Sequence, residues 1–469
     1  MNPSNDCHQH SLRELLDSFE SGSRPKGGVK SIHEGVPSIG GEHLNRNGGF
    51  KFEKIKFVPE KFARSMTRGH LRQGDICVVK DGATTGKVSL VRQDFPFSDA
   101  VINEHVFRLQ VKADHDPAYV FYYLFSAKGQ REILSDFRGA AQGGISQAFV
   151  DKVIVPVVDR SEQKQIIAEI EKQFTRLDAG VVSLERVQTE LKRYRASVLK
   201  AACEGRLVPT EAKLAREENR SYETGAQLLR RILKERREKW NGKGKYREPV
   251  APNEDELPNH PEGWTWATVE QISSCLPGSI QSGPFGSQLL HSEFGAAGIL
   301  AIGIDNIGNG TFSIGKNHRI SETKYLKLKK FSARPGDVVI TVMATVGRVC
   351  VLPADLEPAI ITKHCYRITA ARSVIPGYLS VGLRADGAPR RHLFDNIRGQ
   401  TRPGLNGTIL KATPIPLPPV EEQYRITSEV ERRLTLADSF QQEIETTTRR
   451  SSRLRESVLH QAFHRSSCP

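Results

Sequence analysis

Residues 82–87, with the sequence GATTGK, come close to the glycine-rich pattern that cradles phosphates in nucleotide-binding proteins. That pattern needs four residues between its glycines, so that backbone amides wrap around the phosphates, and a Ser or Thr after the lysine for Mg²⁺. Here Gly82 and Gly86 are separated by three residues, and Val88 follows Lys87. The segment therefore predicts a turn between two strands.

Two acids and a lysine at 159–164 have the residue types of nucleases that bind Mg²⁺. Asp159 and Glu162, however, also stand where a helix should begin, and helix capping explains both acids without a metal. At the matching position of the internal repeat described below, Lys164 is replaced by Tyr424. A structural role is therefore favoured, and no metal ligands are predicted.

His105 and His364 occupy matching positions of the repeat, beside predicted strands, where a structural role is favoured over catalysis. The sequence has no dinucleotide fingerprint, no HExxH zinc motif, no GxSxG turn and no Cys or His cluster at metal-ligand spacing. The Asn2-Pro3 pair lacks the following aromatic residue of an adenine-flipping pocket. We predict a chain without catalytic residues, metal or cofactor of its own; an unrecognised nuclease or methylase is an alternative.

Length and charge limit the possible functions. The 469 residues exceed the ~250–300 at which one hydrophobic core stops growing, so two or more globular units are expected. The net charge of +14 favours a polyanionic partner such as nucleic acid, although a merely soluble basic protein, or one with acidic partner subunits, has the same charge. The absence of a long apolar run or a secretory signal predicts a cytoplasmic protein without a membrane span. Seven scattered cysteines without a CxxC pair predict reduced thiols.

The strongest feature of the sequence is an internal repeat. Residues 156–203 match residues 416–463 without a gap, at a constant offset of 260 residues. Upstream, GDI at 74–76 matches GDV at 336–338, and GKV at 86–88 matches GRV at 347–349. The order is therefore a variable domain, a helix, a linker, a second variable domain and a second helix. Identical pairs along the gapless stretch include Pro156 and Pro416, Glu162 and Glu422, Gln163 and Gln423, Asp178 and Asp438, and Arg195 and Arg455.

Both gapless segments have the spacing of long amphipathic helices, with apolar side chains every three or four positions. Asp159 and Ser161 are candidate N-caps of the first helix, and Gly205 ends it. A helix of ~40 residues is about 60 Å long, farther than one small domain can cover. We therefore expect the two helices to pair antiparallel; packing of each helix on its own domain is the alternative. The predicted seam of the pair consists of Ile166, Ile170, Phe174, Leu177, Leu184, Leu191, Val198, Ile426, Val430, Leu434, Ile444, Leu454 and Val458.

The rest of the chain predicts two mixed α/β domains and a connector. Strand-like runs at 75–80 and 337–342, and helix-like runs at 117–125 and 376–383, are separated by Gly, Asn and Pro turns. The fold class is α+β: two mixed α/β domains separated by a pair of long antiparallel helices, with a pseudo-two-fold internal repeat. The predicted segments are a first domain at 1–158, a helix at 159–204, a linker with a short helix at 205–262, a second domain at 263–418 and a helix at 419–464.

Three sets of motifs together carry a family resemblance. IVPVVDRSEQKQIIAEIEKQF and PIPLPPVEEQYRITSEVERRL look like paired entries into conserved helices, and RQGDICVV and RPGDVVIT look like a strand of a recognition domain. LPNHPEGWTWATV, with Trp264 and Trp266, looks like the opening of such a domain. The combination resembles the specificity subunit of type I restriction-modification systems. The first domain departs from this pattern, since it lacks the GWxW opening and starts with LRELLDSF at Leu12.

The resemblance implies a DNA-specificity subunit with two target-recognition domains, each reading one half-site of a bipartite duplex, while the helix pair sets the spacer. It implies two modification subunits that carry S-adenosylmethionine and methylate adenine at N6, and restriction subunits that use ATP and Mg²⁺. None of these ligands is expected to bind this chain. Glu169, Glu185, Glu429 and Glu445 are candidate contacts for the modification subunits. A coiled-coil scaffold or RNA-binding adaptor that does not read DNA is the alternative.

Candidate DNA contacts lie in basic runs and glycine-rich loops of both domains, because Lys and Arg bind phosphates and Gly permits a close backbone approach. A solvated charged surface explains the basic runs equally well. The candidates are Lys51, Lys54, Lys56, Arg64, Arg68, Lys87, Arg138 and Gln142 in the first domain, and Lys316, Arg319, Lys324, Lys327, Arg348, Arg398, Gln400 and Arg402 in the second.

Overall fold

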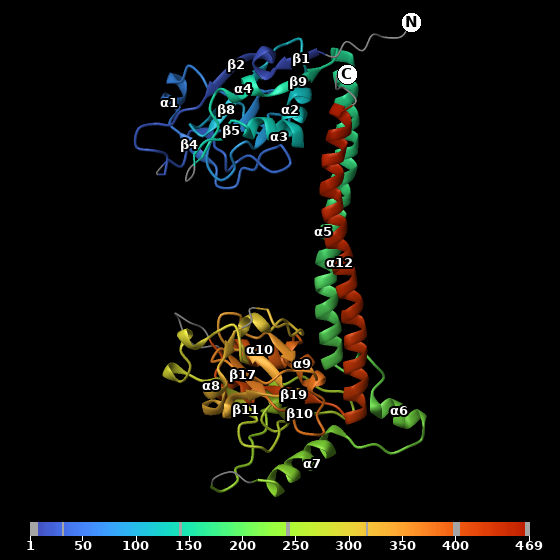
Figure 1. Ribbon diagram of the computed structural model, residues 1–469. Coiled ribbons are helices and arrows are strands. Elements are labelled where there is room, and N and C mark those ends of the chain that lie inside the picture. Colours follow the sequence, from blue (N-terminus) through green and yellow to red (C-terminus); the bar gives the residue numbers. More distant parts are fainter. Residues whose placement is uncertain are drawn as a thin grey trace. The chain divides into compact units, whose positions relative to one another are not determined.

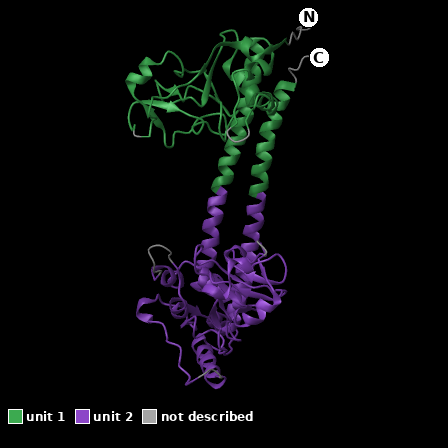
Figure 2. Cartoon of the chain, turned by 60° about the vertical axis from the view of Figure 1, so that its left-hand side comes forward, with its two compact units in different colours: residues 1–186, 444–469 green, residues 187–443 purple. Residues whose placement is uncertain are grey.

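The computed structural model describes residues 8–30, 32–139, 143–240, 244–315, 318–396 and 404–464. The chain divides into two compact units, shown in different colours in Figure 2. Unit 1 consists of residues 1–186 and 444–469, and unit 2 consists of residues 187–443. Each unit therefore contains one mixed α/β domain and part of each long helix, so one helical segment in each unit comes from the other repeat.

The domain of unit 1 is built on a four-stranded antiparallel sheet and a smaller three-stranded sheet (Figure 1). The first sheet has the order β2 (Leu16–Ser21), β8 (Val106–Val111), β5 (Ile76–Val79) and β6 (Val88–Leu90). The second has the order β4 (Lys56–Val58), β3 (Val36–Ile39) and β7 (Val101–Ile102), with β3 parallel to β7. β1 (His8–Ser11) pairs with β9 (Ile154–Val157). The short helices are α1 (Glu60–Ser65), α2 (Pro117–Phe125), α3 (Ala127–Leu134) and α4 (Phe149–Lys152).

The domain of unit 2 repeats this plan. One sheet has the order β11 (Ile280–Ser282), β18 (Cys365–Ile368), β15 (Val338–Thr341) and β16 (Val349–Val351). The other has the order β13 (Arg319–Ile320), β12 (Ile299–Ile302), β17 (Ala359–Ile361) and β14 (Ser332–Ala333). β10 (Thr265–Thr268) pairs with β19 (Pro414–Leu417). The helices are α8 (Glu322–Lys327), α9 (Pro376–Arg384), α10 (Ala388–Asp395) and α11 (Gly407–Ala412), and the connector forms α6 (Glu211–Glu217) and α7 (Gly225–Glu238).

The two long helices are α5 (Arg160–Cys203) and α12 (Val420–His464). The Asp159 carboxylate accepts hydrogen bonds from the amides of Ser161 and Glu162, at 2.8 and 3.0 Å, so the predicted cap is confirmed at Asp159. After the last turn, Gly205 adopts a left-handed conformation with φ of 65°, which ends α5. The predicted domain and linker boundaries stay predictions, because the two compact units divide both helices in their middle.

The helices pair antiparallel in each unit, and the same two residue types mark the pairing. In unit 2, Arg195 of α5 bonds the Asp438 carboxylate of α12 at 2.7 Å and also the Ala437 carbonyl. In unit 1, Arg455 of α12 bonds the Asp178 carboxylate of α5. Since Arg195 and Asp178 match Arg455 and Asp438 in the repeat, the two bridges are related by the internal pseudo-symmetry.

Most residues of the predicted seam also pack on the domains. The apolar stripe therefore serves both the pairing of the two helices and the packing of each helix on a domain. In unit 1, Ile170 and Phe174 join Leu459 and Phe463 in one core with α2 and β9. In unit 2, Val198, Ile426 and Val430 share a core with residues of α7, α9 and β19. The prediction for Leu454 was wrong, because this side chain is 53% exposed on α12.

The connector is anchored on unit 2 by its apolar residues. Leu228 and Ile232 of α7 are buried in the same core as Trp264 and Val198. At the start of α12, the buried Glu422 carboxylate accepts hydrogen bonds from the Trp264 indole at 3.0 Å and from the Glu211 amide at 2.8 Å. This part of the connector therefore belongs to the fold of unit 2.

Candidate nucleic-acid interface

A glutamine at the start of each long helix fixes the helix on its domain. Gln163 accepts a hydrogen bond from the Asp116 amide and donates one to the Val158 carbonyl, at 2.9 and 2.8 Å. Gln423 makes the equivalent bonds in unit 2, with the Ile375 amide and the Pro418 carbonyl, at 2.9 and 3.0 Å. The repeated Glu-Gln motif thus has a structural function, since it ties the helix start to the loop that enters α2 or α9.

In each main sheet a buried arginine on one strand lies beside a buried aspartate that immediately precedes the adjacent strand. In unit 1, Arg108 makes two bonds to Asp75, at 2.6 and 3.0 Å, and a third to Glu20 at 2.9 Å. In unit 2 the matching Arg367 and Asp337 are 3.8 Å apart, and Arg367 donates instead to the Gly278 carbonyl at 2.6 Å. These buried cations are used inside the domains and are not available to a nucleic acid.

The strongest basic cluster of unit 1 surrounds the loop at 43–51. Lys87, on the turn between β5 and β6, donates to the Leu44 carbonyl at 3.0 Å. Burial lowers the pKa of the Lys87 ammonium, and the charges of Lys51 and Arg46 lower it further. Lys87, Lys51 and Arg46 therefore lie close together, and no acidic side chain contributes to the pKa shift of Lys87. A cluster of cations of this kind suits the phosphate backbone of a nucleic acid.

The loop itself is rigidly held on β6. Asn45 accepts hydrogen bonds from the amides of Asn47 and Gly49, at 2.8 and 2.9 Å. The Ser89 hydroxyl donates to the Gly49 carbonyl at 2.7 Å. Gly48 cannot be replaced without a shift, because an added Cβ would lie 2.3 Å from the Phe121 ring. The loop presents Arg46 and Lys51 from a fixed backbone, which is what positioning on a duplex requires.

The corresponding loop of unit 2, at 306–313, has the same anchor and different chemistry. Its turn is closed by Asn306, which accepts from the Gly303 amide at 2.8 Å, as His43 does from Gly40 in unit 1. The Gly310 amide donates to the Val349 carbonyl at 2.8 Å. Residues 306–313 include no Lys or Arg. Arg348, which matches Lys87, is exposed beside this loop.

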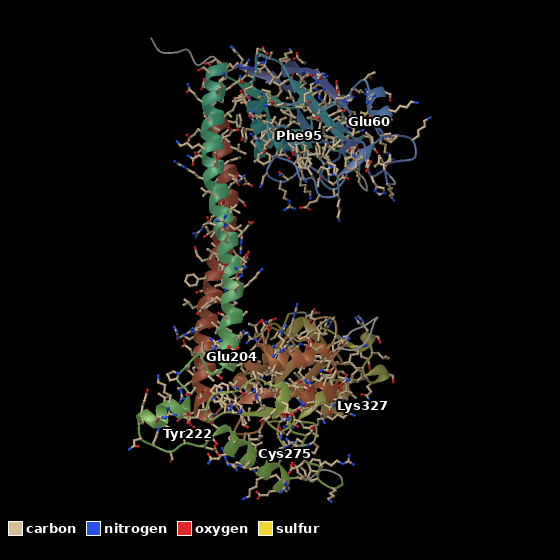
Figure 3. All side chains as sticks on the ribbon, turned by 180° about the vertical axis from the view of Figure 1, so that it is seen from behind. Glu60, Phe95, Glu204, Tyr222, Cys275 and Lys327 are labelled. Carbon is tan, nitrogen blue, oxygen red and sulfur yellow. The ribbon has the colours of Figure 1, made fainter. Side chains whose placement is uncertain are left out.

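The other basic candidates of unit 1 differ in how freely they can bind a ligand. Lys56 pairs with Glu42, and Arg64 pairs with Glu60 at 3.1 Å on α1, while Lys54 and Arg68 are exposed. Figure 3 shows Glu60 on the side of its domain that faces away from the long helices. DNA contact by these four residues stays a prediction. Lys56 and Arg64 are the weaker candidates, because each already forms an ion pair with a glutamate.

Arg138 lies at the edge of a closed loop. Its backbone amide and carbonyl bond Gly144 at 2.9 Å each, and its guanidinium is 3.3 Å from the buried Asp136 carboxylate. Burial alone would raise the pKa of Asp136, but bonds from Lys152 and Ser146 outweigh it and hold that pKa well below its usual range. The Arg138 side chain is 72% exposed and can reach a ligand. Gln142 lies outside the described residues.

Two of the candidates in unit 2 have intradomain partners. Arg319 makes two bonds to Glu357, at 2.7 and 2.6 Å, and a third to the Gly298 carbonyl. Lys324 pairs with Glu293 at 2.6 Å. Lys327 is exposed at the end of α8, on the side of the domain away from the long helices (Figure 3). The candidates Lys316, Arg398, Gln400 and Arg402 lie outside the described residues.

Arg46 is the clearest cation that the sequence-based candidates missed. It is a single basic residue between asparagines, without the run of lysines that marked 51–68. The sequence did contain one indication that Arg46 belongs with Lys51: the two residues are five positions apart, on either side of a glycine-rich turn. His105 forms a hydrogen bond with Asp81 at 2.5 Å, and burial lowers the pKa of His364. The structural role expected of both histidines stays a prediction.

No group of three or more Cys, His, Asp or Glu side chains with metal-binding geometry occurs within the described ranges. In the same ranges, no helix has the length and apolar character that a membrane crossing requires.

A family model described as the type I restriction modification DNA specificity domain matches residues 9–185 and 301–446. The chain belongs to this family. The matched ranges cover the first domain, the second domain from β12 onward and the first part of each long helix, so the specificity domain occurs twice. The resemblance inferred from the motifs is thereby confirmed, together with the α+β fold of two recognition domains and a helix pair.

Curated relatives have the same description along most of the chain. The specificity subunit of the type I restriction enzyme EcoBI from Escherichia coli is 22% identical over 97% of this chain and 86% of its own. The specificity subunit of EcoKI, from Escherichia coli strain K12, is 21% identical over 89% of this chain and 80% of its own. One solved chain, from work on complex assembly and conformational transition of the type I R-M system, has a TM-score of 0.63 at 17% identity and covers 97% of both chains. That structural likeness supports the fold.

Proposed function

We propose that this specificity subunit reads a bipartite DNA target, with one recognition domain on each half-site and the α5–α12 pair setting the spacer. The observation that carries the proposal is the repeated specificity domain, attached to helices that pair with related bridges in both units. Proteins with two-fold symmetry read half-sites at a fixed separation, and a pseudo-symmetric chain with two divergent domains can read two different half-sites.

Shortening the helix pair tests the role of α5 and α12. Removing residues 183–189 of α5 together with 444–450 of α12 keeps the register defined by the Arg195–Asp438 and Arg455–Asp178 bridges. In the assembled methyltransferase, methylome sequencing should show both half-sites unchanged and a different spacer. Substitutions of exposed residues in the same segments, without a deletion, serve as the control. Altered half-sites with an unchanged spacer would refute the proposal.

We assign DNA-backbone contact in unit 1 to the cluster of Arg46, Lys51 and Lys87. The double variant R46Q/K51Q should weaken duplex binding by a similar factor for all sequences and reduce the slope of log K against log salt by ~0.9 per lost phosphate contact. The double variant R216Q/R237Q, on paired residues of α6 and α7, is a matched control for the loss of two surface charges. An unchanged salt slope would contradict the assignment. RNA competition that equals duplex competition would favour the RNA-binding alternative.

The helix pair is also the proposed docking surface for the modification subunits. Tyr194, Leu436 and Phe440 of unit 2 are 38%, 49% and 55% exposed, an unusual exposure for large apolar side chains on a helix. Two of the four candidate glutamates are less suitable, because Glu169 bonds Lys172 and Gln173, and Glu429 bonds Arg432 and Arg433. S-adenosylmethionine, ATP and Mg²⁺ would then be bound by the modification and restriction subunits, and adenine methylation and cleavage would be carried out there.

The variant F440S should reduce copurification of the modification subunit, while E169Q should leave it unchanged. Wild-type copurification of F440S would refute the apolar docking surface. Methylation by the purified chain alone, with labelled S-adenosylmethionine, would refute its non-catalytic role.

A further inference from the structure

The junction between domain and long helices is filled by aromatic side chains in unit 1. Tyr122 of α2 lies edge-on to Phe174 of α5, with ring centroids 5.8 Å apart. Arg92 donates to the Tyr122 hydroxyl at 3.0 Å and to the Glu171 carboxylate at 2.9 Å. Arg455 of α12 lies over the Phe174 ring at 4.8 Å. Cations and acids at this place are therefore satisfied within the chain.

Unit 2 has smaller side chains at the matching positions. When Tyr119 is aligned with Tyr378, Val381 stands where unit 1 has Tyr122. In the gapless helix repeat, Leu434 stands where unit 1 has Phe174. Tyr119 and Tyr378 each donate to the matching proline carbonyl at 2.7 Å, which supports the alignment. A cavity of about 700 Å³ remains between α5, α9, α12 and the loop at 309–311.

Four cations line this cavity, namely Lys192, Arg195, Arg384 and Arg390. Arg384 stands where unit 1 has Phe125, and its Nη2 donates to the Asn309 carbonyl at 3.1 Å. The Nε atoms of Arg384 and Arg195 are both buried and have no hydrogen-bond partner within the described part of the chain. Both guanidinium groups therefore keep hydrogen-bonding capacity that the described part of the chain does not satisfy, although these two Nε atoms are not themselves exposed to the cavity.

Three acids also line the cavity, one fewer than the cations. Asp438 already bonds Arg195 through Nη2, and Asp386 lies 3.5 Å from Nε of Arg390 at the edge of the cavity. Glu431 is exposed on α12. Burial lowers the pKa of the Arg384 guanidinium despite the nearby Asp438 charge, as expected of a cation whose desolvation is incompletely compensated.

We propose that this cavity of unit 2 binds a phosphoryl-bearing anion, held by Arg384 and Arg195. Guanidinium groups match the geometry of phosphate oxygens, and the hydroxyl groups of Thr311 and Ser380 also line the cavity. Free phosphate or polyphosphate can supply this chemistry, and so can the backbone of a bound duplex. The site is independent of the Arg46 cluster of unit 1, so its failure leaves the proposed DNA recognition intact.

Titration of the full chain tests the proposal, with inorganic phosphate, tripolyphosphate and duplex DNA as separate probes at constant ionic strength. The variant R384Q should weaken binding of phosphate probes, duplex or both by at least ~10-fold, because it removes a charge-assisted hydrogen-bond donor. V381Y should do the same by restoring the side chain that fills this space in unit 1. R92Q is the matched control, because Arg92 at the junction of unit 1 already donates hydrogen bonds to Tyr122 and Glu171. This variant should leave the affinities for all three probes unchanged.

The two sources of phosphate give different competition results. Displacement of bound tripolyphosphate by saturating duplex identifies the DNA backbone as the ligand, and independent binding identifies the free anion. Circular dichroism of R384Q and V381Y confirms folding, and if one variant does not fold, the other decides. The proposal is overturned if the folded variants keep the affinities for all three probes within about twofold of wild type.

Discussion

The two domain–helix junctions have the same hydrogen bonds and different interiors. Tyr119 and Tyr378 bond equivalent carbonyls, and Gln163 and Gln423 bond equivalent loops, although the surrounding apolar residues have diverged. A backbone-directed hydrogen bond requires one particular group at one particular place, whereas an apolar space can be filled by several combinations of side chains. The repeat therefore retains the contacts that fix the backbone, and each junction differs in how well it is filled.

The largest expected difference between the units concerns their buried arginines. Replacement of Arg108 by Met should destabilise unit 1 by about 3–5 kcal/mol, because the Asp75 carboxylate loses its counter-charge. Replacement of Arg367 by Met should cost unit 2 only about 1–3 kcal/mol, since Asp337 keeps its bond from the Thr369 hydroxyl at 2.6 Å. Hydrogen exchange resolved by unit measures both effects. Equal losses would show that the wider separation in unit 2 has no energetic consequence.

Truncation of the aromatic contact between α12 and α2 should have the next largest effect. Phe463 lies 5.2 and 5.3 Å, centroid to centroid, from Tyr119 and Tyr123. F463A should destabilise unit 1 by about 3 kcal/mol, while C203A at the matching position should cost unit 2 about 1 kcal/mol, since fewer atoms are removed. Amide protection of α2 and α9 checks the contrast. Unchanged protection of α2 in F463A would contradict the shared core.

The loop beside Arg138 should depend on pH through Asp136. Because the folded pKa of Asp136 is lowered, its contribution is complete above the unfolded pKa of ~3.9 and is lost as pH falls through the folded value. D136N should lower the free energy of unfolding of this loop by about 1.5–3 kcal/mol near neutral pH, and the difference from wild type should shrink below pH ~4.

Exchange of the Ser146 amide, which bonds Asp136 at 2.7 Å, measures this dependence from pH 3 to 7. The aligned Asn396 of unit 2 bonds the His392 carbonyl of its own helix, so N396A is a control without this pH dependence. A deficit in D136N that is constant with pH would contradict the assignment.

The bridges between α5 and α12 should have the smallest effects. Double-mutant cycles with D178N/R455Q and D438N/R195Q should give coupling energies of about 0.2–1 kcal/mol. The Arg455 pair should be the stronger, because Arg455 is 17% exposed and Arg195 is 31% exposed. Denaturation at low and high salt measures both, and a stronger Arg195 pair would reverse this comparison.

The helices and main strands could be predicted because their signals are local and repeated. The expected strands at 75–80 and 337–342 are β5 and β15, and the expected helix at 117–125 is α2. The seam was less predictable, because periodicity does not distinguish a residue that contacts the other helix from one that contacts a domain. Leu454 fits the period and is nevertheless exposed.

For the candidate interface, the sequence could predict which segments are rich in basic residues, but not which of those residues are free to contact DNA. Arg319 and Lys324 lie in a basic run, but their partners Glu357 and Glu293 are distant in sequence, so their ion pairs could not be inferred. Arg46 was missed for the converse reason, since its cluster forms only when the loop at 43–51 meets the β5–β6 turn. Charges close in sequence do not identify charges close in space.

The discontinuity of unit 1 has a consequence for the order in which the protein is completed during synthesis. Unit 2 is a continuous stretch, whereas the core of unit 1 includes Leu459 and Phe463. At ~5–20 residues per second, the ribosome needs on the order of tens of seconds to make the intervening chain. During that time Tyr119 and Tyr123 lack the aromatic partner that α12 provides. The domain made first is therefore the one whose core is completed last.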